Sequence, residues 1–174
     1  MKTKFIFLIF GLFVLVTSGC EKNDDNIDSN GKVELYMIDS YSRIDNSTQI
    51  DENTVITESS PLIYYSDFLS YDSTECIFEL SDRATEAIKD LEHSVHGLAF
   101  AIKANDILIY TGYFWPGYSS ASCDWVVIDP FMTSIGNKIQ VRLGYPGLAQ
   151  GQAIEDKRND GRIIQILKHD NKLK

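Results

Sequence analysis

Glu75-Cys-Ile-Phe-Glu-Leu80, followed by Ser81-Asp-Arg-Ala-Thr-Glu-Ala-Ile-Lys-Asp-Leu91, is the stretch that decides the fold. Its first six residues alternate as in a half-buried strand. Ser81 is a good helix N-cap, and Asp82 follows in the first turn, where the helix dipole favours an anion. Apolar side chains then repeat at helical spacing, at Ala84, Ala87, Ile88 and Leu91. This pattern predicts a strand that leads into an amphipathic helix over about 82–93.

The residues after the helix predict a β-hairpin. Two apolar runs, 98–102 and 107–110, flank Lys103-Ala-Asn-Asp106, and Asn-Asp tolerates the positive φ of a tight turn. Further strands are expected at 33–38, 125–128 and 138–143, and residues 162–167 fit a final strand or a short helix.

The remaining segments are less regular. Residues 39–60 are rich in Ser, Thr, Asn and Asp, which predicts a long loop with at most one short strand, and 66–71 suggest a helical turn capped by Ser66. The fold class is therefore α+β, with a mostly antiparallel sheet of six or seven strands and one helix packed on one face.

The N-terminus has the pattern of an export signal. Lys2 and Lys4 precede an apolar run from 5 to 16, which is too short to span a bilayer, and small residues lead to Cys20. We expect residues 1–19 to be a signal peptide, 20–31 a flexible tether and 32–174 a single globular domain.

Two short patterns resemble features of known lipoproteins. Thr17-Ser18-Gly19-Cys20 resembles the bacterial lipobox, with Thr where Leu is usual, and this implies cleavage before Cys20 and a lipid on its sulfur. Glu21-Lys-Asn-Asp-Asp25 resembles the tether of Bacteroidetes lipoproteins that reach the outer face of the outer membrane. The resemblance implies an outer-membrane lipoprotein, exposed at the cell surface.

Two stretches of the domain also resemble known families. The strand, helix and hairpin of 75–115, with Phe100-Ala-Ile102, are similar to the head subdomain in the periplasmic part of SecD-type export proteins. Ile109-Tyr-Thr-Gly-Tyr-Phe-Trp-Pro116 with Ser119-Ser120 resembles a group of uncharacterised lipoproteins of similar size, which implies no activity.

Charge restricts the partners. Loss of residues 1–19 lowers the basic count from 16 to 14 against 25 acidic residues, so the mature chain carries a net charge of −11. A negative chain is a poor ligand for nucleic acid and for anionic membrane surfaces. Contact with the membrane is therefore expected only through lipid on Cys20, and no cofactor is implied.

Cys76 and Cys123 leave two alternatives open. An exported protein meets an oxidising compartment, where the two residues could form a disulfide. Both also lie in apolar stretches, where buried free thiols act as small apolar side chains.

The densest aromatic group, residues 113–125, offers a possible ligand contact. Pro116-Gly117 turns the chain, so Tyr113, Trp115 and Tyr118 could present rings to a glycan or a peptide. Strand alternation places Tyr113 and Trp115 on one side and Phe114 on the other, so about half of the group should be buried. We favour the core for most of these rings.

Other polar groups give weaker signals. His93 and His96 share a helix face, but two ligands rarely hold a metal, so no metal site is predicted. A hydrolase would draw on the serines before Asp124, yet no Gly-x-Ser-x-Gly elbow is present. Acidic residues fall at positions that do not have the spacing of a calcium loop, namely Asp28, Asp45, Asp51 and Glu52. Asp72-Ser73-Thr74 resembles the short O-glycosylation signal of the Bacteroidetes.

Three functions follow from these observations. The first is a non-enzymatic, lipid-anchored binding or accessory module of the cell envelope, with a glycan or protein partner. The second is a structural or assembly factor that pairs a strand edge with another envelope protein. The third is an envelope hydrolase, which would need His93 or His96 to meet Ser120 and Asp124.

Overall fold

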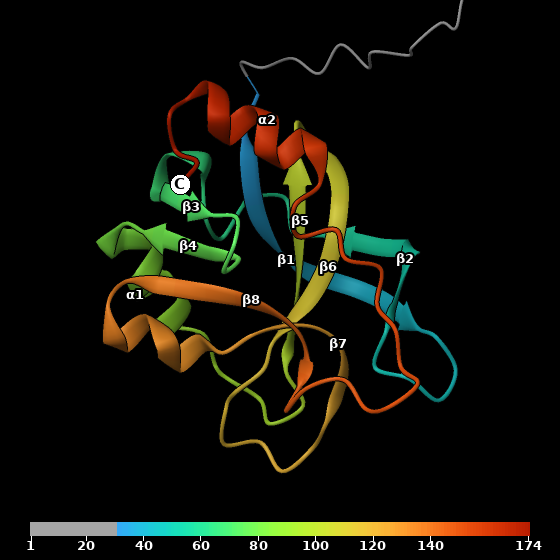
Figure 1. Ribbon diagram of the computed structural model, residues 1–174. Coiled ribbons are helices and arrows are strands. Elements are labelled where there is room, and N and C mark those ends of the chain that lie inside the picture. The colour runs from blue at the N-terminus through green and yellow to red at the C-terminus, as the bar shows by residue number, and fades with distance from the viewer. Residues whose placement is uncertain (1–30) are drawn as a thin grey trace, which may run out of the picture.

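The computed structural model describes residues 31–174, which form a sheet-rich α+β fold (Figure 1). The α+β class is confirmed, but the predicted element count is wrong, because the described residues form eight strands and two α-helices. In chain order the elements are β1 Val33–Arg43, β2 Ile50–Thr57, the 3-10 turn η1 Tyr65–Asp67, β3 Phe68–Asp72, β4 Ile77–Leu80, α1 Asp82–Lys89, β5 Leu98–Ala104, β6 Ile107–Phe114, β7 Cys123–Ile128, the 3-10 turn η2 Pro130–Ile135, β8 Lys138–Tyr145 and α2 Gly161–His169.

The strands form one curled sheet in the order β2-β1-β5-β6-β7-β8-β4-β3. Its neighbouring strands are antiparallel except β6 and β7, which run parallel where Tyr113 faces Val127. A mostly antiparallel sheet is thus confirmed. The strand–helix–hairpin order of 75–115 is also present, but β4 pairs with β3 and β8 whereas β5 pairs with β1 and β6.

Two segments cover strand edges that the linear order leaves open. Leu35 and Ile63 exchange backbone hydrogen bonds of 3.0 and 3.1 Å, so the chain before β3 lies along the first half of β1. The C-terminal residues lie along β3, where Tyr71 N–H donates to Lys172 O at 2.7 Å. Within residues 31–174, the outer edge of β2 has no strand beside it.

The local predictions around 75–110 hold. Ser81 Oγ accepts a hydrogen bond from the Ala84 N–H at 3.2 Å and caps α1. The hairpin turn has φ of 51° at Asn105 and 65° at Asp106, as Asn and Asp permit. The helix ends at Lys89 instead of 93, and Asp90 is its C-cap, with its N–H donating to Glu86 O.

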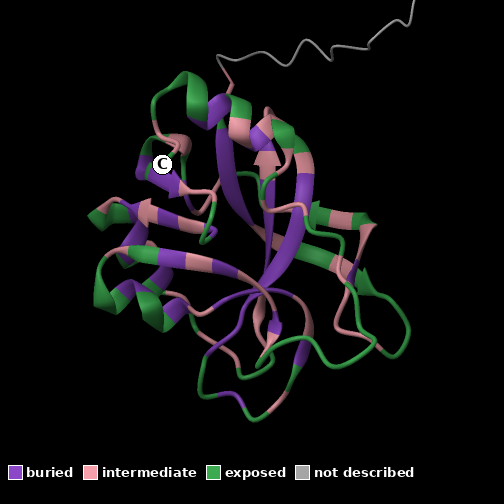
Figure 2. Cartoon of the chain, in the orientation of Figure 1, coloured by how far each residue is buried: buried purple, intermediate pink, exposed green. Residues whose placement is uncertain are grey.

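Helices α1 and α2 bury their apolar sides against the same core (Figure 2). Ala84 and Ile88 of α1 and Ile163, Ile166 and Leu167 of α2 join the buried side chains of the sheet. Of the two alternatives predicted for residues 162–167, a strand or a short helix, the structure has the helix. A second, smaller cluster is formed by Ile50, Ala99, Tyr113, Trp115, Cys123 and Val127.

The prediction of a long loop over 39–60 is wrong. β1 continues to Arg43 and β2 occupies Ile50–Thr57. Both segments lie at the edge of the sheet, where most of their side chains are partly or fully exposed, so the apolar alternation of a half-buried strand is absent. Residues 66–71, predicted as a helical turn, form the end of η1 and most of β3.

Candidate functional site: a cleft at the loop end

Three loops gather at one end of the molecule, which we call the loop end. They are residues 44–49 between β1 and β2, 117–122 before β7, and 146–152 after β8, at the bottom of Figure 1. The described chain begins at residue 31, beside α2 at the opposite end. β1 runs from one end to the other, and its 11 residues at about 3.3 Å each separate the two ends by roughly 30 Å.

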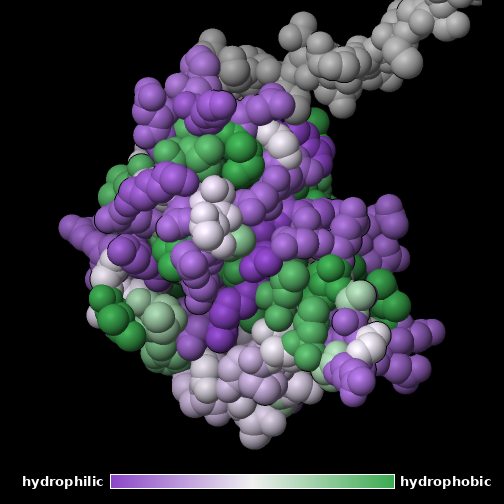
Figure 3. Space-filling view, viewed as in Figure 1, coloured by the Kyte–Doolittle hydropathy of each residue, from purple (hydrophilic) through white to green (hydrophobic). Residues whose placement is uncertain are grey.

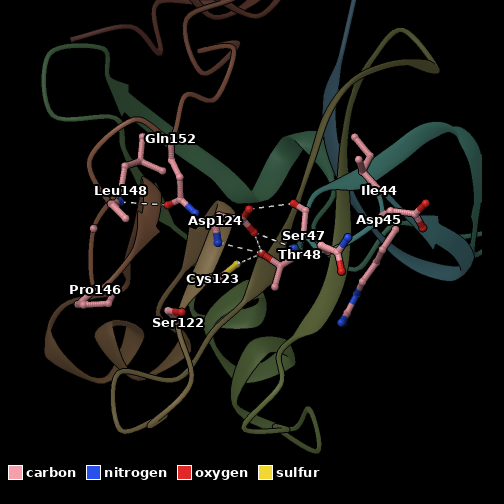
Figure 4. Close-up of a pocket in the computed structure, with 14 residues that line it drawn as sticks. Ile44, Asp45, Ser47, Thr48, Ser122, Cys123, Asp124, Pro146, Leu148 and Gln152 are labelled. Atoms are coloured by element: carbon pink, nitrogen blue, oxygen red, sulfur yellow. Dashed lines mark hydrogen bonds between the residues drawn. The ribbon is translucent and has the colours of Figure 1, made fainter.

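The loop end contains a cleft of about 870 Å³ (Figure 4). This volume lies within the range of pockets that hold small ligands, about 300–1,000 Å³. Its lining comes from the β1–β2 turn, the start of β7 and the loop after β8: Arg43, Ile44, Asp45, Asn46, Ser47, Thr48, Ser122, Cys123, Asp124, Pro146, Gly147, Leu148, Ala149 and Gln152.

Asp124 and Thr48 hold the floor of the cleft together. The Asp124 carboxylate accepts hydrogen bonds from the Thr48 N–H at 2.7 Å, from the Thr48 hydroxyl and from the Ser47 hydroxyl at 2.8 Å. In return the Asp124 N–H donates to Thr48 Oγ1 at 2.8 Å. The Tyr113 hydroxyl donates to Thr48 O at 2.9 Å from below. These bonds fix the β1–β2 turn on the start of β7.

The titratable groups of this floor are not prepared for catalysis. Burial raises the pKa of Asp124, but the hydrogen bonds from Thr48 and Ser47 outweigh it and leave the pKa below its ordinary value. Burial raises the pKa of Cys123, whose Sγ lies 3.2 Å from Thr48 Oγ1. The lowered pKa makes Asp124 a weak base, and the raised pKa keeps Cys123 a neutral thiol, so neither is an activated base or nucleophile.

Above the floor, several polar side chains point to no protein partner. Among residues 31–174, no group hydrogen-bonds the side chains of Asn46 or Ser122. Gln152 accepts a hydrogen bond from the Ala149 N–H at 3.0 Å through Oε1, which leaves its amide N–H groups free. These amides and the hydroxyl can donate to a ligand or accept from it.

Arg43 supplies the cationic group of the cleft. It is the last residue of β1, and its guanidinium lies 5.6 Å from the centre of the Tyr113 ring. Hydrogen bonding with Tyr41 raises the pKa of Arg43 above its ordinary value. In the described part of the chain no carboxylate forms an ion pair with Arg43, although Asp45 lines the same wall.

The walls also present apolar side chains from two opposing loops. Ile44 is 49 % exposed and Leu148 is 36 % exposed, and Pro146 lies at the base of the second loop. No aromatic ring belongs to the lining. The cleft thus combines both kinds of hydrogen-bonding group with a modest apolar contact area.

Two of the three aromatic residues named as possible ligand contacts lie in the core. Tyr113 and Trp115 are buried in the smaller cluster, with 0 and 2 % exposure, because β6 is an interior strand at this point. Tyr118 follows the Pro116-Gly117 turn and is 61 % exposed. It alone of the three remains available to a ligand.

Tyr118 belongs to an exposed apolar patch that the sequence did not indicate. Its ring packs on Phe131 of η2, with centroids 5.3 Å apart, and the His93 ring lies 5.7 Å from Phe131. We define the η2 patch by its exposed apolar residues, Val95, Tyr118, Phe131, Met132 and Ile135. Figure 3 shows apolar side chains gathered at the lower left, where Figure 1 places η2.

The groups considered for hydrolysis are not brought together. Asp124 is bonded to Thr48 and Ser47, and the Ser119 hydroxyl donates to Val95 O at 2.7 Å. His93 packs on Phe131 instead of facing a serine. Within residues 31–174, no group of three or more His, Cys, Asp or Glu side chains could hold a metal ion.

Cys76 and Cys123 are both free and buried, so the disulfide alternative is not formed. The physical reason is their placement, since Cys76 belongs to the large core and Cys123 to the smaller cluster. Cys20, Asp28, the signal segment and residues 20–30 lie outside the described residues.

Comparison with known proteins identified no relative. No family model matches this chain, and no curated protein or solved structure matches it. The lipoprotein and SecD-type resemblances therefore remain predictions. Across residues 31–174, no helix has the length and apolar character needed to cross a membrane.

Sequence reasoning missed Arg43, Thr48 and Gln152 as cleft residues. The turn chemistry of Asp45-Asn46-Ser47 could have indicated a β1–β2 hairpin, and Asn46 indeed has φ of 58°. Nothing local links Thr48 to Asp124, which is 76 residues away in sequence.

Proposed function

We propose that this protein is a non-enzymatic binding module of the cell envelope, anchored by lipid on Cys20, and that the loop-end cleft is its binding site. The observation that carries the proposal is the cleft itself, about 870 Å³ in volume, with free hydrogen-bonding groups above the hydrogen-bonded Asp124 carboxylate. Convergent polar groups in a concave site are the usual mark of ligand binding.

Binding fits this site better than catalysis does. General-base catalysis is most efficient when the pKa of the base lies near the working pH, and the pKa of Asp124 is lowered by the hydrogen bonds it accepts. Covalent catalysis needs an activated nucleophile, and Cys123 has a raised pKa. The hydrolase hypothesis therefore has no support from the groups of the cleft.

The position of the cleft suits an anchored protein. The domain begins at residue 31 beside α2, and the proposed anchor, Cys20, precedes it by eleven residues, which span at most about 40 Å when extended. The cleft lies at the other end of β1. A domain held from this side carries its cleft away from the bilayer, accessible to soluble ligands.

The anchor and the cleft are tested separately. Cells that express the full chain are labelled with an alkyne fatty acid, and a labelled band that disappears in Cys20→Ala establishes lipid attachment. An equally labelled Cys20→Ala protein would contradict it.

For the cleft, the full chain in mild detergent is titrated with envelope peptides and glycan fragments while its melting temperature is followed. A stabilising ligand whose effect is lost in Ala149→Trp, which fills the cleft, supports the proposal. The control Ile135→Trp adds the same ring outside the cleft and should keep the response. A ligand that stabilises all three proteins equally binds elsewhere and contradicts the cleft as its site.

A protein partner is the second candidate function, and the η2 patch favours it. Tyr, Phe and Met are enriched at protein interfaces, and exposed apolar patches mark such sites. The form of this hypothesis that uses a free strand edge has less support, since β2 carries charged residues and a bulge. Cross-linking on intact cells that captures one partner with wild type and loses it in Phe131→Asp would support an assembly role. Capture unchanged by Phe131→Asp would contradict it.

A further inference from the structure

The chemistry of the cleft narrows its ligand. Resting on the proposed function, we infer that the cleft binds the carboxyl-terminal end of a peptide. Arg43 faces the terminal carboxylate, the Asn46 and Gln152 amides meet the peptide groups, and Ile44 with Leu148 contacts the last side chain.

The first argument concerns Arg43, which has no acidic partner among the described residues. Of the 13 Lys and Arg side chains between 32 and 174, seven have a carboxylate within ion-pair distance, and Arg43 is one of the six that do not. It is the basic residue among those that line the cleft. Arg43 is instead positioned by two tyrosines, Tyr41 and Tyr113. These tyrosines use part of the hydrogen-bonding capacity of Arg43. A guanidinium has five N–H donors, so the remaining donors can bind a ligand carboxylate.

The uncharged groups of the cleft match a peptide backbone. A peptide bond presents one N–H donor and one C=O acceptor. Asn46 can supply both kinds of group, and Gln152 can donate from its free amide nitrogen. Ser122 adds a hydroxyl on the opposite wall. These groups come from different loops, so an extended ligand can contact them in succession.

The absence of rings argues against a glycan. Sugars are held commonly by stacking on an aromatic face, and the cleft lining contains none. Its apolar groups are aliphatic, and Figure 4 shows Ile44 and Leu148 on opposite sides of the polar floor. Such a pair suits an aliphatic side chain, for which contact area rather than ring geometry decides the affinity.

The experiment uses the full chain in mild detergent and a pool of N-acetylated tetrapeptides that end in Leu or Val, prepared as free acids and as C-terminal amides. We expect the free acids to bind at least tenfold more tightly than the amides by calorimetry. In Arg43→Gln this advantage should disappear, while Arg43→Lys should keep part of it, since it keeps the charge without the fork. Equal affinity of acids and amides for the wild type would overturn the inference.

The matched control is Arg142→Gln. Arg142 also lies over a tyrosine ring, 6.0 Å from the Tyr145 centroid, but does not line the cleft. It should leave the preference for free acids unchanged, and an equal loss in Arg142→Gln and Arg43→Gln would overturn the role given to Arg43. Melting temperatures of the variants separate unfolding from loss of binding.

Two further measurements distinguish a short peptide from a protein C-terminus as the ligand, and distinguish failure of this inference from failure of the proposed function. The same four residues at the end of a 20-residue peptide test whether a protein C-terminus enters, and either result supports carboxylate recognition. Binding of glycan fragments but no peptide would overturn the inference and leave the proposed function standing. No change in binding of any ligand upon Ala149→Trp would overturn the proposed function itself.

Discussion

The two ends of the molecule differ in how many of their polar side chains are hydrogen-bonded within the protein. At the α2 end, side chains satisfy one another, as when the Tyr65 hydroxyl donates to Asp170 at 2.7 Å and Lys172 donates to Tyr65 O at 2.8 Å. At the loop end the floor of the cleft is satisfied in this way, but the side chains of Asn46 and Ser122 above it have no partner among the described residues. One end therefore stabilises the fold, while the other keeps hydrogen-bonding capacity for a ligand.

The largest effect on stability should come from the core beneath α2. Phe78 is fully buried and stacks on Tyr71, with centroids 4.2 Å apart. Phe78→Ala removes a ring and leaves a cavity, so the free energy of unfolding should fall by about 3–5 kcal/mol. Chemical denaturation measures this. A loss below about 1 kcal/mol would indicate that this end does not carry the stability assigned to it.

A smaller loss is expected at the floor of the cleft. Thr48→Val keeps the shape of the side chain but removes the hydroxyl that bonds both the carboxylate and the N–H of Asp124. Partly buried groups left without a partner should cost about 1–3 kcal/mol. Thr48→Ser restores the hydroxyl and should recover most of that loss. If Thr48→Val and Thr48→Ser are equally stable, the hydrogen bonds of the floor contribute nothing to the free energy of unfolding.

The pH dependence of stability isolates the Asp124 carboxylate. Its folded pKa is lowered, so the stability that it contributes is complete above its unfolded pKa of about 3.9 and is lost as the pH falls through the folded pKa. Asp124→Asn should therefore be less stable than wild type at neutral pH, and this difference in the free energy of unfolding should shrink as the pH falls below about 4. Denaturation at a series of pH values tests this, and a deficit that is constant with pH would contradict the assignment.

The smallest effect is expected at the η2 patch. Ile135 is 78 % exposed, so Ile135→Ser should change the free energy of unfolding by no more than about 0.5 kcal/mol. Thermal melts measure it. A substantial loss would mean that the patch supports the fold, which would remove the difference drawn between the two ends.

Predictions succeeded where the deciding interactions are local. The start of α1 follows from Ser81 and the residues of the next turn, and the β5–β6 turn from Asn105 and Asp106. They failed where the environment decides. Residues 39–43 of β1 and all of β2 were taken for part of a long loop, because strands at the sheet edge lack the alternation that burial of one face produces. For Tyr113 and Trp115 the sequence left ligand contact and core as alternatives, and the structure buries both rings.

The sequence alone determined the α+β class, the capped start of the helix and the hairpin, since each depends on side chains a few residues apart. The export-like N-terminus stays a prediction. Only the tertiary structure decided that Thr48 bonds Asp124, that Arg43 lies beside Tyr113, and that Cys76 and Cys123 belong to separate clusters. The physical reason is that the residues of each pair are about 50–80 positions apart in the sequence. Strand order and sheet curvature bring such residues together, and neither property is encoded in local spacing.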